Sequence, residues 1–289
     1  MKIFCVAFVA LALASTAVCA DKKATTPAQK PAKALPANTA ASTIPASAKV
    51  EVTYFPADSV ASDNGLQWLK QLNYLEEIAE AVQTSIRLPK PLNLVGQPCG
   101  EPNAFYSPDG KSIVLCYELV DLIVRQAGKA KEPGSRKKLP EESRGLLAFG
   151  AITFVTFHEM GHALIDVLDL PITGREEDVA DQIATFLSLH DLKDEEDHET
   201  AKWIVVGGSW YFRMLSQQGQ LGGLADEHSL DEQRLYNVAC WAYGSDPRRY
   251  ADLVPVFRGA SGRLLGCDAE HAKMHRALTT LIGPSLTPQ

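Results

Sequence analysis

A long apolar segment in the middle of the chain contains two histidines and a glutamate, and it restricts the fold more than any other feature. The segment runs from Leu146 to Leu168, and a proline and a glycine follow it. Its length and apolar content predict a buried helix. His158 and His162 are four residues apart, so their imidazoles project side by side from such a helix. Because ionisable side chains are costly to bury alone, the fold must supply a partner for them.

The His-Glu-x-x-His pattern in this segment predicts a catalytic zinc site. Two imidazoles at this spacing can share one metal ion, which would pair both buried histidines. Glu159 follows His158 directly, where its carboxylate can take a proton from zinc-bound water. Chance occurrence is the alternative, and the apolar surroundings argue against it. We therefore predict that His158 and His162 bind one Zn²⁺ ion per chain and that Glu159 is the general base.

A third protein ligand is expected from the acidic cluster that follows. A second helix is predicted over Glu176–Leu189, after a short connection. Glu177 and Asp181 share one face of it, so Glu177 can bind zinc while Asp181 accepts the outer N–H of His158. Carboxylates in a first helical turn also offset the helix dipole without any metal. Glu176 is the alternative third ligand.

These two helices resemble the gluzincin branch of the zinc metallopeptidases, in which a His-Glu-x-x-His helix precedes a Glu-x-x-x-Asp helix. From residue 50 to nearly its end, the chain is also similar to a family of secreted bacterial proteins predicted to be zinc metallopeptidases and formerly defined as a domain of unknown function. The resemblance implies a zincin fold and a peptide or protein substrate. Besides the two helices, the similar stretches are Cys99–Tyr106, Cys116–Leu119, Asp226–Ser229 and Gln233–Asn237.

The chain is predicted to be exported and to fold as one domain. Residues 1–20 combine Lys2, an apolar core and a small-residue end around Cys19, which is typical of a cleavable signal peptide. Residues 21–48 are rich in Ala, Pro and Lys and predict a disordered tether, which leaves residues 49–289 as a zincin-like domain. No later stretch is apolar enough for stable membrane insertion. We expect a periplasmic or secreted protein.

The charge distribution argues against one class of partner. Residues 1–48 hold five of the 28 Lys and Arg but only one of the 35 Asp and Glu, so the predicted domain has a formal charge of −11. Nucleic-acid binding depends on clustered positive charge along the phosphates. An acidic domain is therefore not expected to bind nucleic acid.

Four cysteines remain after the predicted signal peptide, and an even number in an exported chain predicts two disulfides. A turn signal at residues 107–110 separates two strand-like segments, and the resulting hairpin would bring Cys99 near Cys116. By elimination, Cys240 pairs with Cys267. Zinc ligation by thiolates is the weaker alternative, because no short Cys-x-x-Cys spacing is present.

The remaining patterns predict a helix-rich α+β fold with a small sheet. One strand is expected at Val50–Tyr54, and the disulfide hairpin supplies two more. If the resemblance to zincins extends to the sheet, the hairpin segments Ala104–Tyr106 and Ile113–Leu115 form the edge that binds an extended substrate; an ordinary core strand is the alternative. Further helices are predicted near residues 67–84, 117–126, 199–216, 231–243 and 269–282.

A histidine outside the motif is a candidate for transition-state stabilisation. His228 follows Asp226 and Glu227, which could hold its orientation while it donates to an oxyanion. Tyr236 and Arg234 are rivals for this role, and a surface loop histidine is the alternative.

His271 and His275 share the i,i+4 spacing on a predicted helix. They could form a second metal site with Glu270, but an exposed helix face is the favoured interpretation. Two other functions also remain open for the chain as a whole: a non-catalytic zinc-binding exported module, and a zinc hydrolase of a non-peptide amide or ester.

Overall fold

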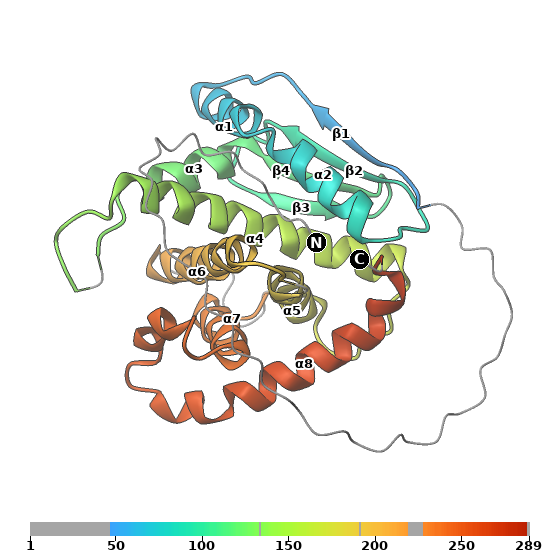
Figure 1. Cartoon of the computed structure of the whole chain (residues 1–289). Coiled ribbons are helices and arrows are strands. Elements are labelled where there is room, and N and C mark those ends of the chain that lie inside the picture. The colour runs from blue at the N-terminus through green and yellow to red at the C-terminus, as the bar shows by residue number, and fades with distance from the viewer. Residues whose placement is uncertain (1–46, 133, 191, 219–227, 288–289) are drawn as a thin grey trace, which may run out of the picture.

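A computed structural model of the chain describes residues 47–132, 134–190, 192–218 and 228–287 (Figure 1). The predicted signal peptide and all but the last two residues of the predicted tether lie outside the described residues. The fold is α+β and rich in helices, with one four-stranded sheet, as the sequence predicts. Within the described ranges, no helix is both long and apolar enough to cross a membrane.

The sheet has the strand order β1-β2-β4-β3. Both β1 (Val50–Tyr54) and β4 (Ser112–Cys116) pair in parallel with β2 (Leu92–Gln97). β3 (Ala104–Ser107) pairs antiparallel with β4 and forms the predicted hairpin. Because β4 is its one neighbour in the order, β3 is an edge strand.

The sequence does not predict the central strand β2. Pro91 precedes it and Gly96 lies within it, and both residue types are turn signals. In the fold, Leu92 and Leu94 are fully buried, and a Cβ atom at Gly96 would lie 2.9 Å from the ring of Tyr117. Packing against this ring therefore requires glycine in the strand, and tertiary contacts override the local signal.

The prediction of one helix over residues 67–84 is wrong. Two helices, α1 (Val60–Gln71) and α2 (Tyr74–Ser85), cover this region. Asn73, which caps α2, has a φ of 47°, and this left-handed conformation ends the first helix. The apolar periodicity continues across the break, so it does not reveal the break in the sequence.

Helix α4 (Glu141–Val167) contains the His-Glu-x-x-His motif and lies at the centre of the fold. It packs against β3, β4 and α3 (Tyr117–Ala127) on one side and against α5 (Glu176–Leu189) and α6 (Glu195–Gln218) on the other (Figure 1). Nearly every residue from Leu147 to Val167 is buried, as expected of a helix between two layers.

The C-terminal part continues the helical layer. It consists of α7 (Asp231–Ser245), α8 (Cys267–Leu281) and short 3-10 helices at Ala251–Phe257, Ser261–Gly266 and Gly283–Ser285. One disulfide joins Cys240 of α7 to Cys267 of α8, and another joins Cys99 to Cys116 at the end of β4. These pairings are the ones expected from the sequence, and they fasten the sheet and the helical layer separately.

Candidate metal centre

The two motif histidines meet α5 where the two helices come closest. A Cβ atom at Gly161 would lie 2.8 Å from Cα of Ala180, so this close approach requires glycine. As a result, Oε2 of Glu177 lies 3.0 Å from Nε2 of His158 and 3.4 Å from Nε2 of His162. The fold thus brings together the three side chains that the sequence predicts as metal ligands.

The outer nitrogen of each motif histidine contacts a carboxylate. Nδ1 of His158 lies 2.9 Å from Oδ1 of Asp181, and Nδ1 of His162 lies 2.8 Å from Oε1 of Glu176. In a neutral imidazole whose Nδ1 donates to a carboxylate, Nε2 holds the lone pair. Deprotonation of both rings, which metal binding requires, therefore leaves lone pairs on the two Nε2 atoms, which are 3.3 Å apart and face the carboxylate of Glu177.

Three electron-pair donors that converge in this way fit a cation. In a tetrahedral zinc site with ligand bonds of about 2.0–2.2 Å, neighbouring ligand atoms lie roughly 3.4 Å apart. The corresponding separations among His158, His162 and Glu177 are 3.0–3.4 Å. Two imidazoles and a carboxylate are also a donor set that zinc prefers, so these residues fit the metal that the motif implies.

Glu176 and Glu177 occupy different positions although they are adjacent. Glu177 faces Nε2 of both histidines, whereas Glu176 contacts Nδ1 of His162 and is half exposed. This geometry favours Glu177 over Glu176 as the third ligand. It also gives Glu176 a role that the sequence does not predict, equivalent to that of Asp181 at His158.

A buried arginine fixes the orientation of Asp181. Nε of Arg234 donates to Oδ2 of Asp181 and Nη2 donates to Oδ1, both at 2.8 Å. The guanidinium also lies 4.2 Å from the ring centroid of Phe212. Arg234 therefore supports Asp181, and neither Arg234 nor Tyr236 lines the cleft of about 690 Å³ that contains the centre. Of the three candidates for the oxyanion donor, only His228 reaches this cleft.

His228 lies on the outer side of the centre. Its Nε2 is 2.9 Å from Oε2 of Glu177, and its ring stacks at 6.0 Å from that of His158. Arg175 donates to the backbone carbonyl of His228 at 3.3 Å, and Ser229 donates to Asp178 at 2.6 Å. Asp226 and Glu227, the orienting residues predicted for His228, lie outside the described residues.

A cleft of about 690 Å³ connects the metal centre with the edge strand β3. Tyr106 of β3 donates to Asp166 near the end of α4 at 2.5 Å, and Lys111 contacts the same carboxylate at 2.6 Å, so the strand is anchored to the helix. Phe105 is 39% exposed. The lining residues are Asn103, Ala104, Phe105, Tyr106, Pro108, His158, Glu159, His162, Arg175, Glu176, Glu177 and His228.

Burial and hydrogen bonding shift the pKa values of the centre in opposite directions. Burial lowers the pKa of His158, but its hydrogen bonds to Asp181 and Glu177 outweigh burial and raise the pKa to about 9. Burial alone would raise the pKa values of Glu177 and Asp181. Hydrogen bonds from the neighbouring imidazoles instead hold the pKa of Glu177 well below its usual range, and the Arg234 guanidinium does the same for Asp181. Burial raises the pKa of Glu159. Glu159 therefore binds a proton more readily than an exposed glutamate does.

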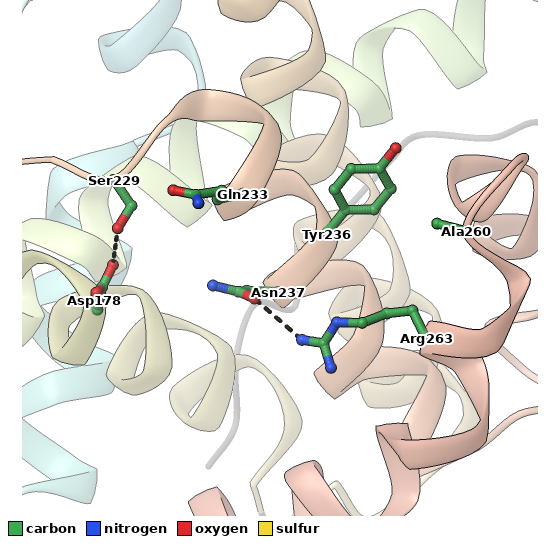
Figure 2. A pocket seen from close by; sticks show the side chains of 7 residues that line it. All are labelled: Asp178, Ser229, Gln233, Tyr236, Asn237, Ala260 and Arg263. Carbon is green, nitrogen blue, oxygen red and sulfur yellow. Dashed lines mark hydrogen bonds between the residues drawn. The ribbon is translucent and has the colours of Figure 1, made fainter. Parts of the chain in front are cut away.

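A second pocket of about 420 Å³ lies next to this centre without sharing a lining residue with it. Figure 2 shows Gln233, Tyr236 and Asn237 of α7 together with Arg263, which donates to Asn237 at 3.2 Å. The Ser229–Asp178 hydrogen bond closes one side of this pocket (Figure 2). Tyr236, which the sequence makes an alternative to His228 as the oxyanion donor, lines this second pocket.

Comparison with known proteins gives one match. A family model, DUF4344, described as "Putative metallopeptidase", matches residues 54–282. No curated protein and no solved structure shows a significant match.

The close contact at Gly161 predicts a measurable effect on metal binding. We expect Gly161→Ala to push α5 away from α4, to lower the free energy of unfolding by about 1–3 kcal/mol, and to weaken zinc binding. Gly145→Ala is the matched control, because Gly145 lies on the same helix with open space around it. The control should stabilise the helix by up to about 1 kcal/mol. Equal zinc affinity in the two variants, measured by calorimetry, would contradict this account.

The pKa of His158 predicts how the chelated, metal-free protein responds to pH. Its pKa in the fold, about 9, exceeds the ordinary value of 6.5, so the fold stabilises the charged form. That contribution is complete below about pH 6.5 and is lost as pH rises through about 9. We expect the Tm to fall across this window, and to fall less in His158→Gln. A Tm that rises or stays constant in the wild-type protein would oppose the assignment.

Proposed function

The chain belongs to the DUF4344 family, and on this premise we propose that it is an exported, gluzincin-like zinc peptidase. One observation carries the proposal: two imidazole nitrogens and a carboxylate oxygen converge within 3.4 Å, beside a buried glutamate and an open cleft. His158, His162 and Glu177 would hold the ion, with Asp181 and Glu176 orienting the two imidazoles. A bound zinc ion would polarise the scissile carbonyl and lower the pKa of water in the centre.

Glu159 is proposed as the general base. Its carboxylate takes a proton from the attacking water and later gives it to the nitrogen of the leaving amine. Two properties support this role: Glu159 lines the same cleft as the two histidines, and its pKa is raised by burial. A carboxylate with a raised pKa is a stronger base in the first step, and its acid form persists to higher pH for the second.

His228 is proposed as the donor to the developing oxyanion. Its Nε2 lies at the edge of the centre, 2.9 Å from Oε2 of Glu177, so an N–H there can reach an oxygen beside the metal ligands. Its pKa is raised, chiefly by the hydrogen bond to Glu177, which favours a protonated imidazole. The contacts of Arg175 with the backbone carbonyl of His228 and of Ser229 with Asp178 hold the backbone that carries this ring.

The edge strand β3 is proposed to bind the substrate backbone. Ala104, Phe105 and Tyr106 line the cleft, and among the described residues β4 is the one strand paired with β3. An extended peptide can therefore pair with the other side of β3 and lie across the metal centre. This arrangement favours a peptide over a small ester as the substrate.

Export is proposed from the sequence of residues 1–20, with residues 21–48 as a tether and residues 49–289 as the catalytic domain. Two disulfides in the described domain agree with an oxidising compartment such as the periplasm or the extracellular space.

Replacement of the proposed base tests whether the chain is an enzyme. We expect Glu159→Gln to retain zinc and to lower cleavage of a peptide library by about 10²–10⁴-fold. Glu142→Gln, an exposed position on the same helix, is the control and should change neither property. Zinc content is measured by elemental mass spectrometry alongside cleavage. Full peptidase activity in Glu159→Gln would refute the assignment of the base, whereas a zinc-loaded wild-type protein that cleaves nothing would favour a binding module.

Replacement of His228 separates an oxyanion donor from a metal ligand. We expect His228→Ala to keep its zinc while kcat falls by about 10²–10³-fold. His198→Ala, on α6, is the matched control and should retain full activity. Loss of zinc from His228→Ala would instead make His228 a ligand, and undiminished turnover would remove it from the mechanism.

A further inference from the structure

Three histidines outside the metal centre lie where α5 meets α8, and two of them contact one phenylalanine. His190 caps the C-terminal end of α5, and His271 and His275 lie one turn apart on α8, which runs beneath α5 in Figure 1. The ring centroid of Phe186 lies 4.6 Å from that of His190 and 5.4 Å from that of His275. The structure thus places His190 beside an i,i+4 pair from which it is separated by about 80 residues in the sequence.

The spacing of these rings resembles that of the candidate metal centre. The ring centroids are 5.6 Å apart for His271 and His275, and 5.8 Å apart for His190 and His275. In the metal centre, the ring centroids of the two proposed ligands His158 and His162 are 4.9 Å apart. The second cluster therefore holds its imidazoles at distances from which a single ion can be shared.

Three further features favour metal binding at this cluster. All three rings are only partly buried, so an ion has access to them from solvent. Six of the seven histidines of the chain belong to the two clusters, and only His198 belongs to neither. The net charge of −11 from residue 49 onward also favours the approach of cations.

The favoured interpretation of His271 and His275 as an exposed helix face does not describe their surroundings, because both are partly buried. Glu270, the third residue of the alternative site, pairs with Arg263 instead. Among the described residues, the group of three whose ligand atoms already lie within 4.8 Å of one another is His158, Glu177 and His228, at the metal centre. The rings of the second cluster must therefore turn about their side-chain bonds to converge, as partly exposed side chains can.

We propose that His190, His271 and His275 form a second metal site, which binds a first-row transition-metal ion such as Zn²⁺ through imidazole nitrogens. Imidazole ligands suit zinc, copper and nickel and do not suit magnesium or calcium. An ion at this site joins the end of α5 to α8. The opposite end of the same helix carries Glu177, so the second site fastens the element that completes the metal centre.

Zinc stoichiometry tests this proposal independently of any peptidase activity. The full-length mature protein is titrated with Zn²⁺ in a calorimeter, and elemental mass spectrometry gives the zinc content after desalting. We expect two equivalents in the wild-type protein, one in His271→Ala/His275→Ala, and two in the His198→Ala control. His158→Ala/His162→Ala should lose the other equivalent and keep this one. A single equivalent in the wild-type protein, or two in His271→Ala/His275→Ala, would overturn the proposal.

His190→Ala tests the third ligand separately, because it leaves the i,i+4 pair intact. We expect the Kd of the second equivalent to rise by about tenfold or more. An unchanged Kd would overturn the three-histidine site. Far-ultraviolet circular dichroism establishes that each variant is folded, and zinc beyond the first equivalent should raise the Tm of the wild-type protein but not that of His271→Ala/His275→Ala.

Discussion

The close approach of α4 and α5 at Gly161 and Ala180 is the constraint on which the candidate centre depends. Gly161 lies between the two motif histidines in the sequence. Because it has no side chain, α5 can pack against α4 close to the two imidazoles. A carboxylate on the first turn of α5 then reaches both inner nitrogens, and Asp181 one turn later reaches an outer one. The position of one glycine therefore links helix packing to the chemistry of the centre.

The charged residues around the centre contact one another in succession, from the buried core to the solvent side. Arg234, held against Phe212, fixes Asp181 through two hydrogen bonds, and Asp181 fixes His158. The buried charges of Arg234 and Asp181 thus have partners of opposite sign, which limits the cost of burying them. On the solvent side, Glu176 supports His162 from a half-exposed position. The more buried of the two imidazoles therefore also has the more rigid support.

Helical spacing explains how much of this centre the sequence predicts. The i,i+4 relations within α4 and within α5 place His158 beside His162 and Glu177 beside Asp181, and a short connection brings the two pairs together. Contacts between distant segments leave no such pattern: Arg234 at Asp181 and His190 beside His275 require the folded chain. The sheet shows the same limit. The turn at residues 107–110 marks the hairpin, whereas parallel pairing with β1 and β4, rather than its own sequence, establishes β2.

The cleft joins the centre to the free side of β3, so an extended chain bound there would pass the metal ligands and the proposed base. The proposed mechanism requires that Glu177, and not the adjacent Glu176, completes the centre. The most direct measurement is the zinc content of Glu177→Ala and Glu176→Ala, each made in the His271→Ala/His275→Ala background so that the proposed second site binds no zinc, beside that parent protein. We predict near-stoichiometric zinc in the parent, nearly none when Glu177→Ala is added, and affinity lowered by about 10–100-fold when Glu176→Ala is added. Zinc retained with Glu177→Ala, or no zinc in any of the three proteins after reconstitution, would contradict the proposed metal centre.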